Sequence, residues 1–243
     1  MIALKIRKAL RALAYARDRR ALTRGVGASL EHSVVLRSLP PAGTILDIGA
    51  NKGQFILEAI KWHSGANLIA FEPLESERAL MEYTLAGEPR LTIYPVALGQ
   101  EDTTVTFHVS TAADSSSILE QTALQAETFP GTQNAAHVEI PVRRLDHVLD
   151  RSALAGPVIC KIDVQGFELN VLIGFGGLLD AVDYLIVELT NIPFYEGAPN
   201  SADVIAFLAA RGFKILGIYS MYLERGVALQ ADFLFGRTVQ KWL

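Results

Sequence analysis

The stretch TILDIGANKG, residues 44–53, decides the fold of this chain. Its apolar half, Thr44–Ile48, is typical of a buried strand, and Gly53 begins a segment whose apolar residues recur at helical spacing. Gly49 and Asn51 lie between the two. A glycine at such a turn lets the backbone approach a ligand closely, because no Cβ stands in the way. The pattern predicts a strand–turn–helix unit of the kind that holds a nucleotide.

A second acid marks the end of the next apolar run. Glu72 comes 25 residues after Asp47 and closes the run LIAFEP, residues 68–73. Neighbouring parallel strands end at the same edge of a sheet, so these two acids are expected close together there. A carboxylate at position 72 can bind both hydroxyls of a ribose. The alternative is that Glu72 only caps the helix that follows it.

The form of the turn distinguishes two classes of nucleotide cofactor. Residues 47–53 read D-x-G-x-x-x-G, whereas dinucleotide folds prefer G-x-G-x-x-G because the pyrophosphate needs amides at the start of the helix. The charge of Asp47 would repel a pyrophosphate but suits a cationic ligand. S-adenosylmethionine carries a sulfonium and an ammonium group, which favours it over NAD. The residues predicted to bind it are Asp47, Gly49, Asn51, Gly53 and Glu72.

The rest of the chain predicts one α/β domain, residues 41–243, after a basic helical extension, residues 1–40. Strands and helices alternate at first, which predicts parallel pairing with right-handed crossovers. The rhythm breaks over residues 97–156, a polar insertion long enough to be a lid over a substrate site. Strands are expected at Thr44–Ile48, Leu68–Phe71, Leu91–Val96, Thr104–Val109, Val138–Val142, Val158–Ile162 and Tyr184–Leu189, with a closing antiparallel hairpin of Phe213–Ile218 and Asp232–Phe235. Helices are expected at Leu30–Leu39, Gly53–Trp62, Glu75–Leu85, Phe167–Ile173 and Ser201–Ala210, the last with Ser201 as its N-cap.

Composition and charge exclude several classes of protein. Half of the 243 residues are apolar, yet no run of about 18 uncharged apolar residues occurs, so no membrane-spanning helix is expected. The single cysteine, Cys160, lies in the apolar run VICKI and excludes an internal disulfide framework, which favours a cytoplasmic location. The formal net charge is −4, and the acidic body argues against a nucleic-acid partner.

The positive charge is concentrated in residues 1–24, which carry eight basic residues against Asp18. Ile2, Ile6, Leu10 and Leu13 recur there at helical spacing. Two interpretations stay open: a helix lying on an anionic membrane surface, or a solvated helix covering a domain edge.

Seven segments, in order, resemble the FkbM family of methyltransferases. They are ILDIGANKGQF (45–55), IAFEPLESERALMEYTL (69–85), VALGQEDTTVTFHV (96–109), the serines 115–117, VRRLDHVL (142–149), KIDVQGFELNVLIG (161–174) and IVELTNIPFYEG (186–197). The most family-specific of them is 161–174, where the family usually has an acid in place of Gln165. The resemblance implies a class I methyltransferase fold: a Rossmann-like, seven-stranded, mostly parallel sheet with helices on both faces and an antiparallel C-terminal strand. It also implies S-adenosylmethionine as donor and methyl transfer to oxygen, often a hydroxyl of a sugar, glycolipid or secondary metabolite.

The catalytic groups are expected after the fourth and fifth strands of the main sheet. Asp163, Glu188 and Asn191 follow those strands and should meet at one sheet edge. A base beside the acceptor hydroxyl speeds methyl transfer, so Asp163 and Glu188 are the predicted catalytic or orienting groups. Asp163 could instead cap the next helix, and Glu188 could instead pair with Lys161. No compact ligand spacing indicates a metal, and none is expected.

Weaker candidates complete the site. His108, His137 and His147 are alternative bases. Ser115–Ser117 could bind a polyhydroxy acceptor or form a turn, and Phe194 with Tyr195 could form an aromatic wall or belong to the core. The acceptor itself, a small molecule or glycan, and the oligomeric state are not fixed by the sequence. Besides an NAD-dependent oxidoreductase, a non-catalytic membrane-associated assembly protein with this fold stays open.

Overall fold

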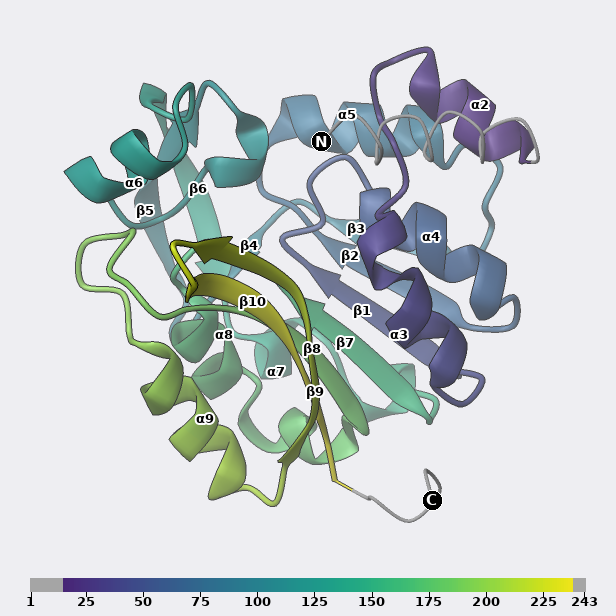
Figure 1. Ribbon diagram of the computed structural model, residues 1–243. Coiled ribbons are helices and arrows are strands. Elements are labelled where there is room, and N and C mark those ends of the chain that lie inside the picture. The colour runs from purple at the N-terminus through teal and green to yellow at the C-terminus, as the bar shows by residue number, and fades with distance from the viewer. Residues whose placement is uncertain (1–14, 238–243) are drawn as a thin grey trace.

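The main sheet of the computed structural model, which describes residues 15–237, has seven strands in the order β3-β2-β1-β7-β8-β10-β9 (Figure 1). β1 (Thr44–Ile48) lies between β2 (Asn67–Phe71) and β7 (Val158–Ile162), and all three are parallel. β3 (Leu91–Tyr94) and β8 (Tyr184–Thr190) extend this parallel part on either side. β10 (Val227–Gly236) is antiparallel to both of its neighbours, β8 and β9 (Lys214–Glu224). This is the class I methyltransferase fold that the sequence predicts.

Helices cover both faces of the sheet, and a separate apolar core lies under each layer. One layer consists of α2 (Ala16–Leu22), α3 (Ser33–Ser38), α4 (Gln54–Trp62) and α5 (Glu75–Thr84). The other consists of α7 (Leu145–Val148), α8 (Glu168–Gly174), the 3₁₀ helix η4 (Gly176–Ala181) and α9 (Ser201–Ala209). The central strands β1 and β7 are buried along their whole length, as their continuous apolar sequences predict.

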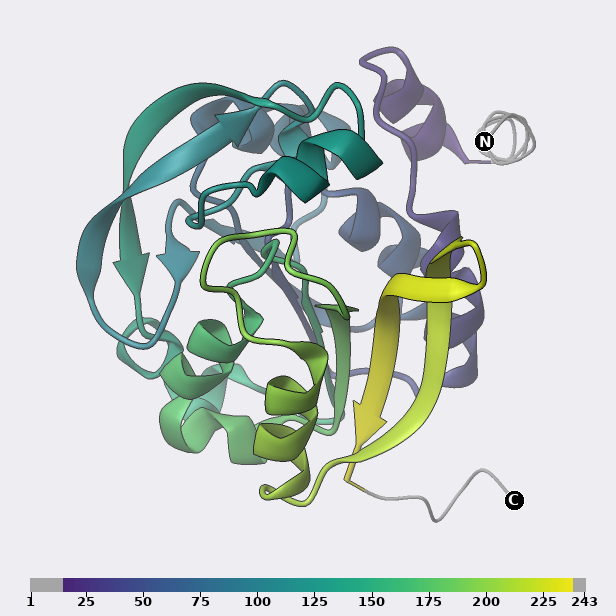
Figure 2. The ribbon, with the colours of Figure 1, turned by 60° about the vertical axis from the view of Figure 1, so that its left-hand side comes forward.

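The expected third strand, Leu91–Val96, is shorter in the structure, where β3 ends at Tyr94. Ala97–Leu98 forms β4, which the sequence pattern does not predict, in a second sheet of order β4-β6-β5. Pro95 lies between β3 and β4, and because proline has no N–H it ends the ladder there. The second sheet also contains β5 (Thr103–Ser110) and β6 (Asn134–Arg143), and it lies apart from the main sheet (Figure 2).

Several boundaries differ from the expectation. The α6 helix (Ala123–Thr128), inside the insertion, is not predicted by the sequence pattern. The N-cap of α9 is Asn200 rather than Ser201, and it forms a capping box with Asp203. The β9–β10 hairpin is longer than predicted because Arg225 and Gly226, both at positive φ, form its two-residue turn.

The N-terminal extension is described only from residue 15 onward, so the predicted amphipathic spacing of Ile2 to Leu13 lies outside the described residues. The α2 helix packs beside α5, and its buried Asp18 accepts a hydrogen bond from Lys61 Nζ at 2.6 Å. Arg17 pairs with Glu88 at 2.8 Å. These contacts attach the part of the extension from residue 15 to 22 to the domain.

Candidate functional site

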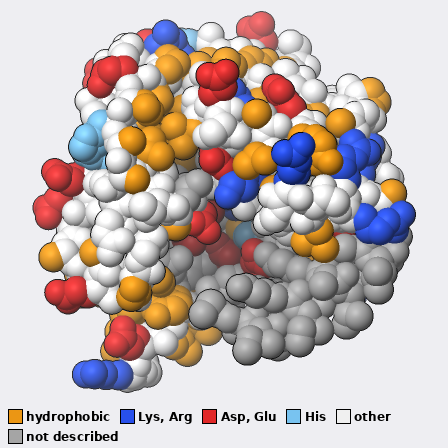
Figure 3. Space-filling view, turned by 90° about the horizontal axis from the view of Figure 1, so that it is seen from above, with side chains coloured by type: hydrophobic (Ala, Val, Ile, Leu, Met, Phe, Trp, Pro, Cys, Tyr) orange, Lys and Arg blue, Asp and Glu red, His pale blue; other side chains and the backbone are white. Residues whose placement is uncertain are grey.

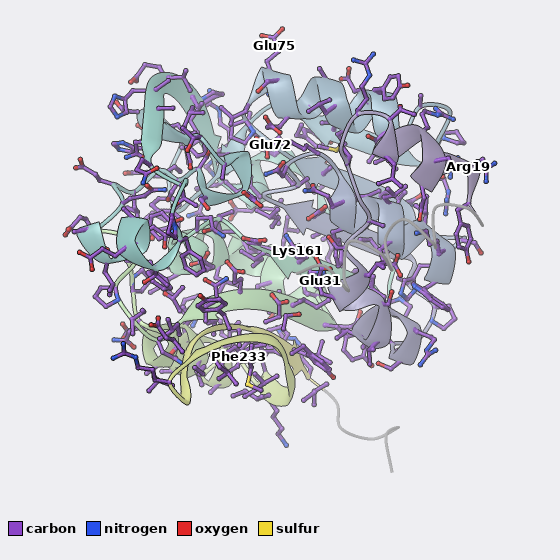
Figure 4. The ribbon with its side chains drawn as sticks, turned by 45° about the horizontal axis from the view of Figure 1, so that its top comes forward. Arg19, Glu31, Glu72, Glu75, Lys161 and Phe233 are labelled. Carbon is purple, nitrogen blue, oxygen red and sulfur yellow. The ribbon has the colours of Figure 1, made fainter. Side chains whose placement is uncertain are left out.

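A cavity of about 280 Å³ opens at the carboxyl ends of the parallel strands. It is lined by the turn after β1, the segments after β2 and β7, and the short 3₁₀ helix η1 (Leu30–His32). In the space-filling view, several acidic side chains lie in and beside the hollow (Figure 3). Glu72, Lys161 and Glu31 lie in the middle of the molecule in Figure 4, whereas Arg19 and Glu75 lie at its periphery. The predicted site residues that line the cavity are Gly49, Asn51, Glu72, Asp163 and Glu188.

The turn after β1 needs its glycines for packing as well as for ligand access. Gly49 has a φ of 76°, and a Cβ there would overlap the carbonyl oxygen of Asp163. Gly53 has a φ of 78°, and its Cβ would lie 2.7 Å from Met81 Cγ. Both conformations are ones that L-residues rarely adopt. The turn is thereby fixed against the end of β7 on one side and against α5 on the other.

Glu72 holds the turn from the neighbouring strand. Its Oε2 accepts the Asn51 N–H at 2.8 Å and its Oε1 accepts the Leu74 N–H at 2.9 Å. Burial raises the pKa of Glu72 to about 7, although these two hydrogen bonds favour the ionised form. Each carboxylate oxygen still has a lone pair for a further donor, and the residue lines the cavity. The carboxylate therefore fits two adjacent hydroxyls of a ribose.

Four charged side chains form a row on one face of the sheet. Asp47 lies opposite Lys161 in the pairing of β1 with β7, and Glu188 lies opposite Asp232 in the pairing of β8 with β10. Lys161 Nζ lies 3.0 Å from Asp163 Oδ2 and 3.8 Å from Asp47 Oδ1. Burial lowers the pKa of Lys161, but the charges of Asp163 and Asp47 outweigh this and raise it. The lysine is held as a cation among acids.

Asp47 is the least accessible member of this row. Its side chain is fully buried beside Lys161, it is not among the lining residues, and neither of its oxygens has a hydrogen-bond partner in the described part of the chain. Burial raises the pKa of Asp47 to about 6, with Lys161 acting in the opposite direction. Asp47 therefore does not contact the cavity, but its charge stabilises the cationic form of Lys161, which lines the cavity.

Asp163 and Glu188 are joined by one amide. Gln165 Nε2 donates to Asp163 Oδ1 at 2.8 Å and to Glu188 Oε2 at 2.7 Å. Gln230 Nε2 donates to the other oxygen of Glu188 at 2.8 Å. The structure therefore shows neither alternative from the sequence: Asp163 does not cap α8, and Glu188 does not pair with Lys161.

The two carboxyls differ in proton affinity. Burial pushes the pKa of Asp163 upward, but the charge of Lys161 and the hydrogen bond from Gln165 hold it below its usual range. Burial raises the pKa of Glu188 well above its usual range, and the charges of Asp163 and Asp232 add to this effect. Of the two, Glu188 is the stronger base.

Gln165 also connects these acids to the insertion. Its Oε1 accepts the Tyr195 O–H at 2.7 Å, and its carbonyl oxygen accepts the Ser117 O–H at 2.7 Å. The residue has a φ of 56°, a left-handed conformation that is uncommon outside glycine and asparagine. One residue thereby links the acids at the strand ends, the loop after β8 and the insertion.

The other end of the cavity is apolar. Leu74 follows β2, Ala97 and Leu98 form β4, and Phe167 precedes α8. From the insertion come Phe107 and Ile118. Leu74, Ala97, Phe107 and Ile118 belong to one apolar cluster, and Leu74 is hydrogen-bonded to Glu72, so a flat heterocycle attached to a ribose fits beside them.

Most of the weaker candidates lie away from the cavity. His108 and His137 face each other across β5 and β6, and neither lines the cavity. His147 pairs with Asp102 at 3.1 Å, and both side chains are well exposed. The Asn191 side chain bonds the Ala228 carbonyl and Ser201.

The aromatic and serine candidates have structural contacts. Phe194 packs edge-on against Phe129 in a buried cluster, and Tyr195 is buried as well, so neither forms an aromatic wall. Ser116 lines the cavity, but its Oγ accepts the Ser110 N–H at 3.0 Å.

Sequence reasoning missed two polar residues of the cavity, His32 on η1 and Asp232 on β10. His32 Nε2 lies 3.3 Å from Asp232 Oδ2. The acid within the apolar run ADFLF was a usable signal for Asp232, because a charged residue in a buried strand needs a reason. No local pattern marked His32.

The described residues contain no group of three or more His, Cys, Asp and Glu side chains arranged to hold a metal ion. Within residues 15–237, no helix has the length and apolar character needed to cross a bilayer.

Comparison with known proteins identifies relatives of the chain. The model of the methyltransferase FkbM domain matches residues 47–215. The chain is 24% identical over 196 residues to the 2-O-methyltransferase NoeI of Sinorhizobium fredii, covering 78% of this chain and 80% of that protein. It is 27% identical over 218 residues to the 31-O-demethyl-FK506 methyltransferase FkbM of Streptomyces tacrolimicus, covering 77% of each. Among solved structures, Sp1610 of Streptococcus pneumoniae in complex with S-adenosyl-L-methionine matches with a TM-score of 0.49 and 14% identity, over 89% of this chain and 76% of that one.

Proposed function

The chain belongs to the FkbM family of S-adenosylmethionine-dependent methyltransferases, and we propose that it methylates a hydroxyl oxygen of a small molecule or glycan. The proposal rests on the cavity itself. It is lined by Glu72, a carboxylate suited to bind a ribose, and by the acids Asp163 and Glu188. The two relatives named as O-methyltransferases support oxygen as the acceptor atom.

The residues present fit the donor. Glu72 would bind the ribose hydroxyls. The turn that contains Gly49 and Asn51 would bring its backbone close to the donor. Leu74 and Leu98 would hold the adenine ring. When bound, S-adenosylmethionine supplies an electrophilic methyl group on a positively charged sulfur, and the acids around Lys161 favour that charge.

Glu188 is the base of the proposed reaction and Asp163 an orienting group. Asp163 accepts a hydrogen bond from the Lys161 cation at 3.0 Å, and the pKa of Asp163, which that charge lowers, makes it a weak proton acceptor. Glu188 would accept the proton of the acceptor O–H, while the bound donor would supply the methyl group and leave as the neutral thioether. The hydrogen-bond donors to the two oxygens of Glu188 are the neutral amides of Gln165 and Gln230, so Glu188 keeps a higher proton affinity than Asp163. Asp163 then fixes the acceptor relative to the methyl group, which supplies much of the rate.

The acceptor side is formed by the insertion, residues 97–156, and the loop 190–197. They are joined where the Thr122 hydroxyl donates to the Pro193 carbonyl at 2.8 Å, and where the Gln121 and Tyr195 backbones form a bridge. In the proposed function, the insertion is the lid of the acceptor site, as long insertions beside sites often are.

Titration calorimetry with S-adenosylhomocysteine tests the donor site. The Glu72→Gln variant replaces one acceptor oxygen by an N–H donor, so affinity is expected to fall at least tenfold, since a hydrogen bond to a charged group is worth about 1.5–3 kcal/mol. Glu75→Gln is the matched control, because Glu75 is an exposed acid three residues away on α5. Equal affinities for Glu72→Gln and the control would remove Glu72 from the site.

An NADH fluorescence titration tests the oxidoreductase alternative. No binding is expected, because the turn carries Asn51 where a pyrophosphate-binding turn has a second glycine. Saturable NADH binding that S-adenosylhomocysteine fails to displace would contradict the proposed function.

A further inference from the structure

His32 and Asp232 form part of the cavity wall, although both lie outside the matched family domain, residues 47–215. His32 precedes that domain on η1, and Asp232 follows it on β10. The η1 helix is attached to the donor turn, since the Ser29 N–H donates to the Gln54 carbonyl at the start of α4 at 3.1 Å. The chain therefore completes its cavity with segments from either side of the matched domain.

His32 is buried and its ring is held in place. It is 6% exposed, and its ring packs edge-on against Phe55, the second residue of α4, at a centroid distance of 5.2 Å. Nε2 lies within ion-pair distance of Asp232 but is not aligned for a hydrogen bond. Nδ1 has no hydrogen-bond partner in the described part of the chain. A buried ring nitrogen without a partner is costly, so a ligand group is the expected partner.

The charges around His32 indicate which ligand group this is. His32 is near enough to Asp47 and Asp163 for its charge to favour the ionised form of each. Among the described residues that line the cavity, the basic side chains are Lys161 and His32. Lys161 is already occupied by Asp163 at 3.0 Å. An anionic ligand group in this part of the cavity therefore has His32 as its available basic partner.

We propose that His32, oriented by Asp232, binds the α-carboxylate at the amino-acid end of the methyl donor. The inference rests on the proposed function, since it concerns the same donor. The negative charges of the acids in this row are complementary to the positive ammonium and sulfonium groups of the methyl donor. The carboxylate of the methyl donor is negatively charged, so it needs an N–H donor from a basic side chain. Asp232 Oδ2 lies 3.3 Å from Nε2, on the opposite side of the ring from Nδ1, and the doubly protonated ring offers its Nδ1–H to the carboxylate.

Calorimetry with three ligands tests this assignment. S-adenosylhomocysteine carries the ammonium and the carboxylate, 5′-(3-aminopropylthio)-5′-deoxyadenosine lacks only the carboxylate, and 5′-methylthioadenosine lacks both. The His32→Asn variant is expected to bind the first about tenfold more weakly, and the other two with unchanged affinity. His147→Asn is the matched control, because it removes a histidine from the exposed pair with Asp102.

The outcomes are distinguishable from failure of the proposed function. Equal weakening of all three ligands by His32→Asn would show a structural role and overturn the inference, as would unchanged affinity for S-adenosylhomocysteine. Binding of 5′-methylthioadenosine by the variant shows that the cavity is still folded. If the wild type binds none of the three, the donor site and this inference fail together.

Discussion

Replacing Gln165 by glutamate tests the charge balance of the acid cluster. The change removes an Nε2 group that donates to Asp163 and Glu188 at 2.8 and 2.7 Å, and it adds a third carboxyl between them. Losing two hydrogen bonds to charged groups costs about 3 kcal/mol or more of unfolding free energy. Repulsion between three acids adds to this cost while all are ionised.

The expected cost of Gln165→Glu depends on pH. The new carboxyl should have a folded-state pKa raised by its neighbours, so it lowers stability most above that pKa and least in acid, where it is protonated and can donate one hydrogen bond. Urea unfolding at about pH 5.5 and pH 8 is expected to show a loss of roughly 2 kcal/mol at the lower pH and 4 or more at the higher.

Gln165→Met is the control, because it removes the same donors without adding a charge. Its loss is expected to be about 3 kcal/mol, and the same at both pH values. If Gln165→Glu and Gln165→Met lose the same amount at every pH, the acids are not close enough to repel and the reasoning is refuted.

Three further predictions follow from the same geometry. Gly49→Ala should lower the free energy of unfolding by at least about 2 kcal/mol, because the new Cβ would overlap the Asp163 carbonyl oxygen at a residue whose φ is 76°. Gly65→Ala is the control, since no atom lies within 4 Å of its new Cβ, and it should change the free energy of unfolding little. Equal melting temperatures for the two variants would contradict the packing argument. Burial raises the pKa of Glu168 and of Glu72 to about 7, so the free energy of unfolding of the ligand-free protein should fall as pH rises from about 4.5 to 7. Urea unfolding of Glu168→Gln should show a smaller fall over that pH range. If the variant's free energy of unfolding falls as much as that of the wild type, Glu168 does not contribute to the pH dependence. Tyr195→Phe removes the O–H that donates to Gln165, and it should make the insertion more accessible to protease. The affinity for S-adenosylhomocysteine should stay within about twofold of the wild-type value. A large loss of that affinity would contradict the proposed separation of the donor and acceptor sides of the cavity.

The parallel core was predictable because its signals are local. β1 and β7 have the predicted bounds, since each is a short apolar run buried on both faces and bounded by turn residues. The position of Glu72 at the cavity followed from the rule that neighbouring parallel strands end at the same edge of the sheet. Its hydrogen bond to the Asn51 N–H did not, because the sequence does not give the geometry of the turn.

The acid cluster was only partly predictable. Asp163 and Glu188 were expected to meet, and they do, but the amide of Gln165 between them was not foreseen. Its position depends on a left-handed backbone conformation that glutamine rarely adopts. His32 and Asp232 lie about 200 residues apart in the sequence, one before and one after the matched domain of residues 47–215. No periodicity or motif in the sequence predicts a contact between such distant residues.

The connection between the insertion and the loop after β8 bears on engineering of the acceptor range. Residues far apart in the chain are hydrogen-bonded to each other here: Ser117 to Gln165, and Thr122 to Pro193. A chimera that exchanges only the insertion for that of a relative would leave these partners mismatched. Grafting both segments as one cassette, with the residue at position 165 included, would keep the interface intact, and under the proposed function it would change the acceptor.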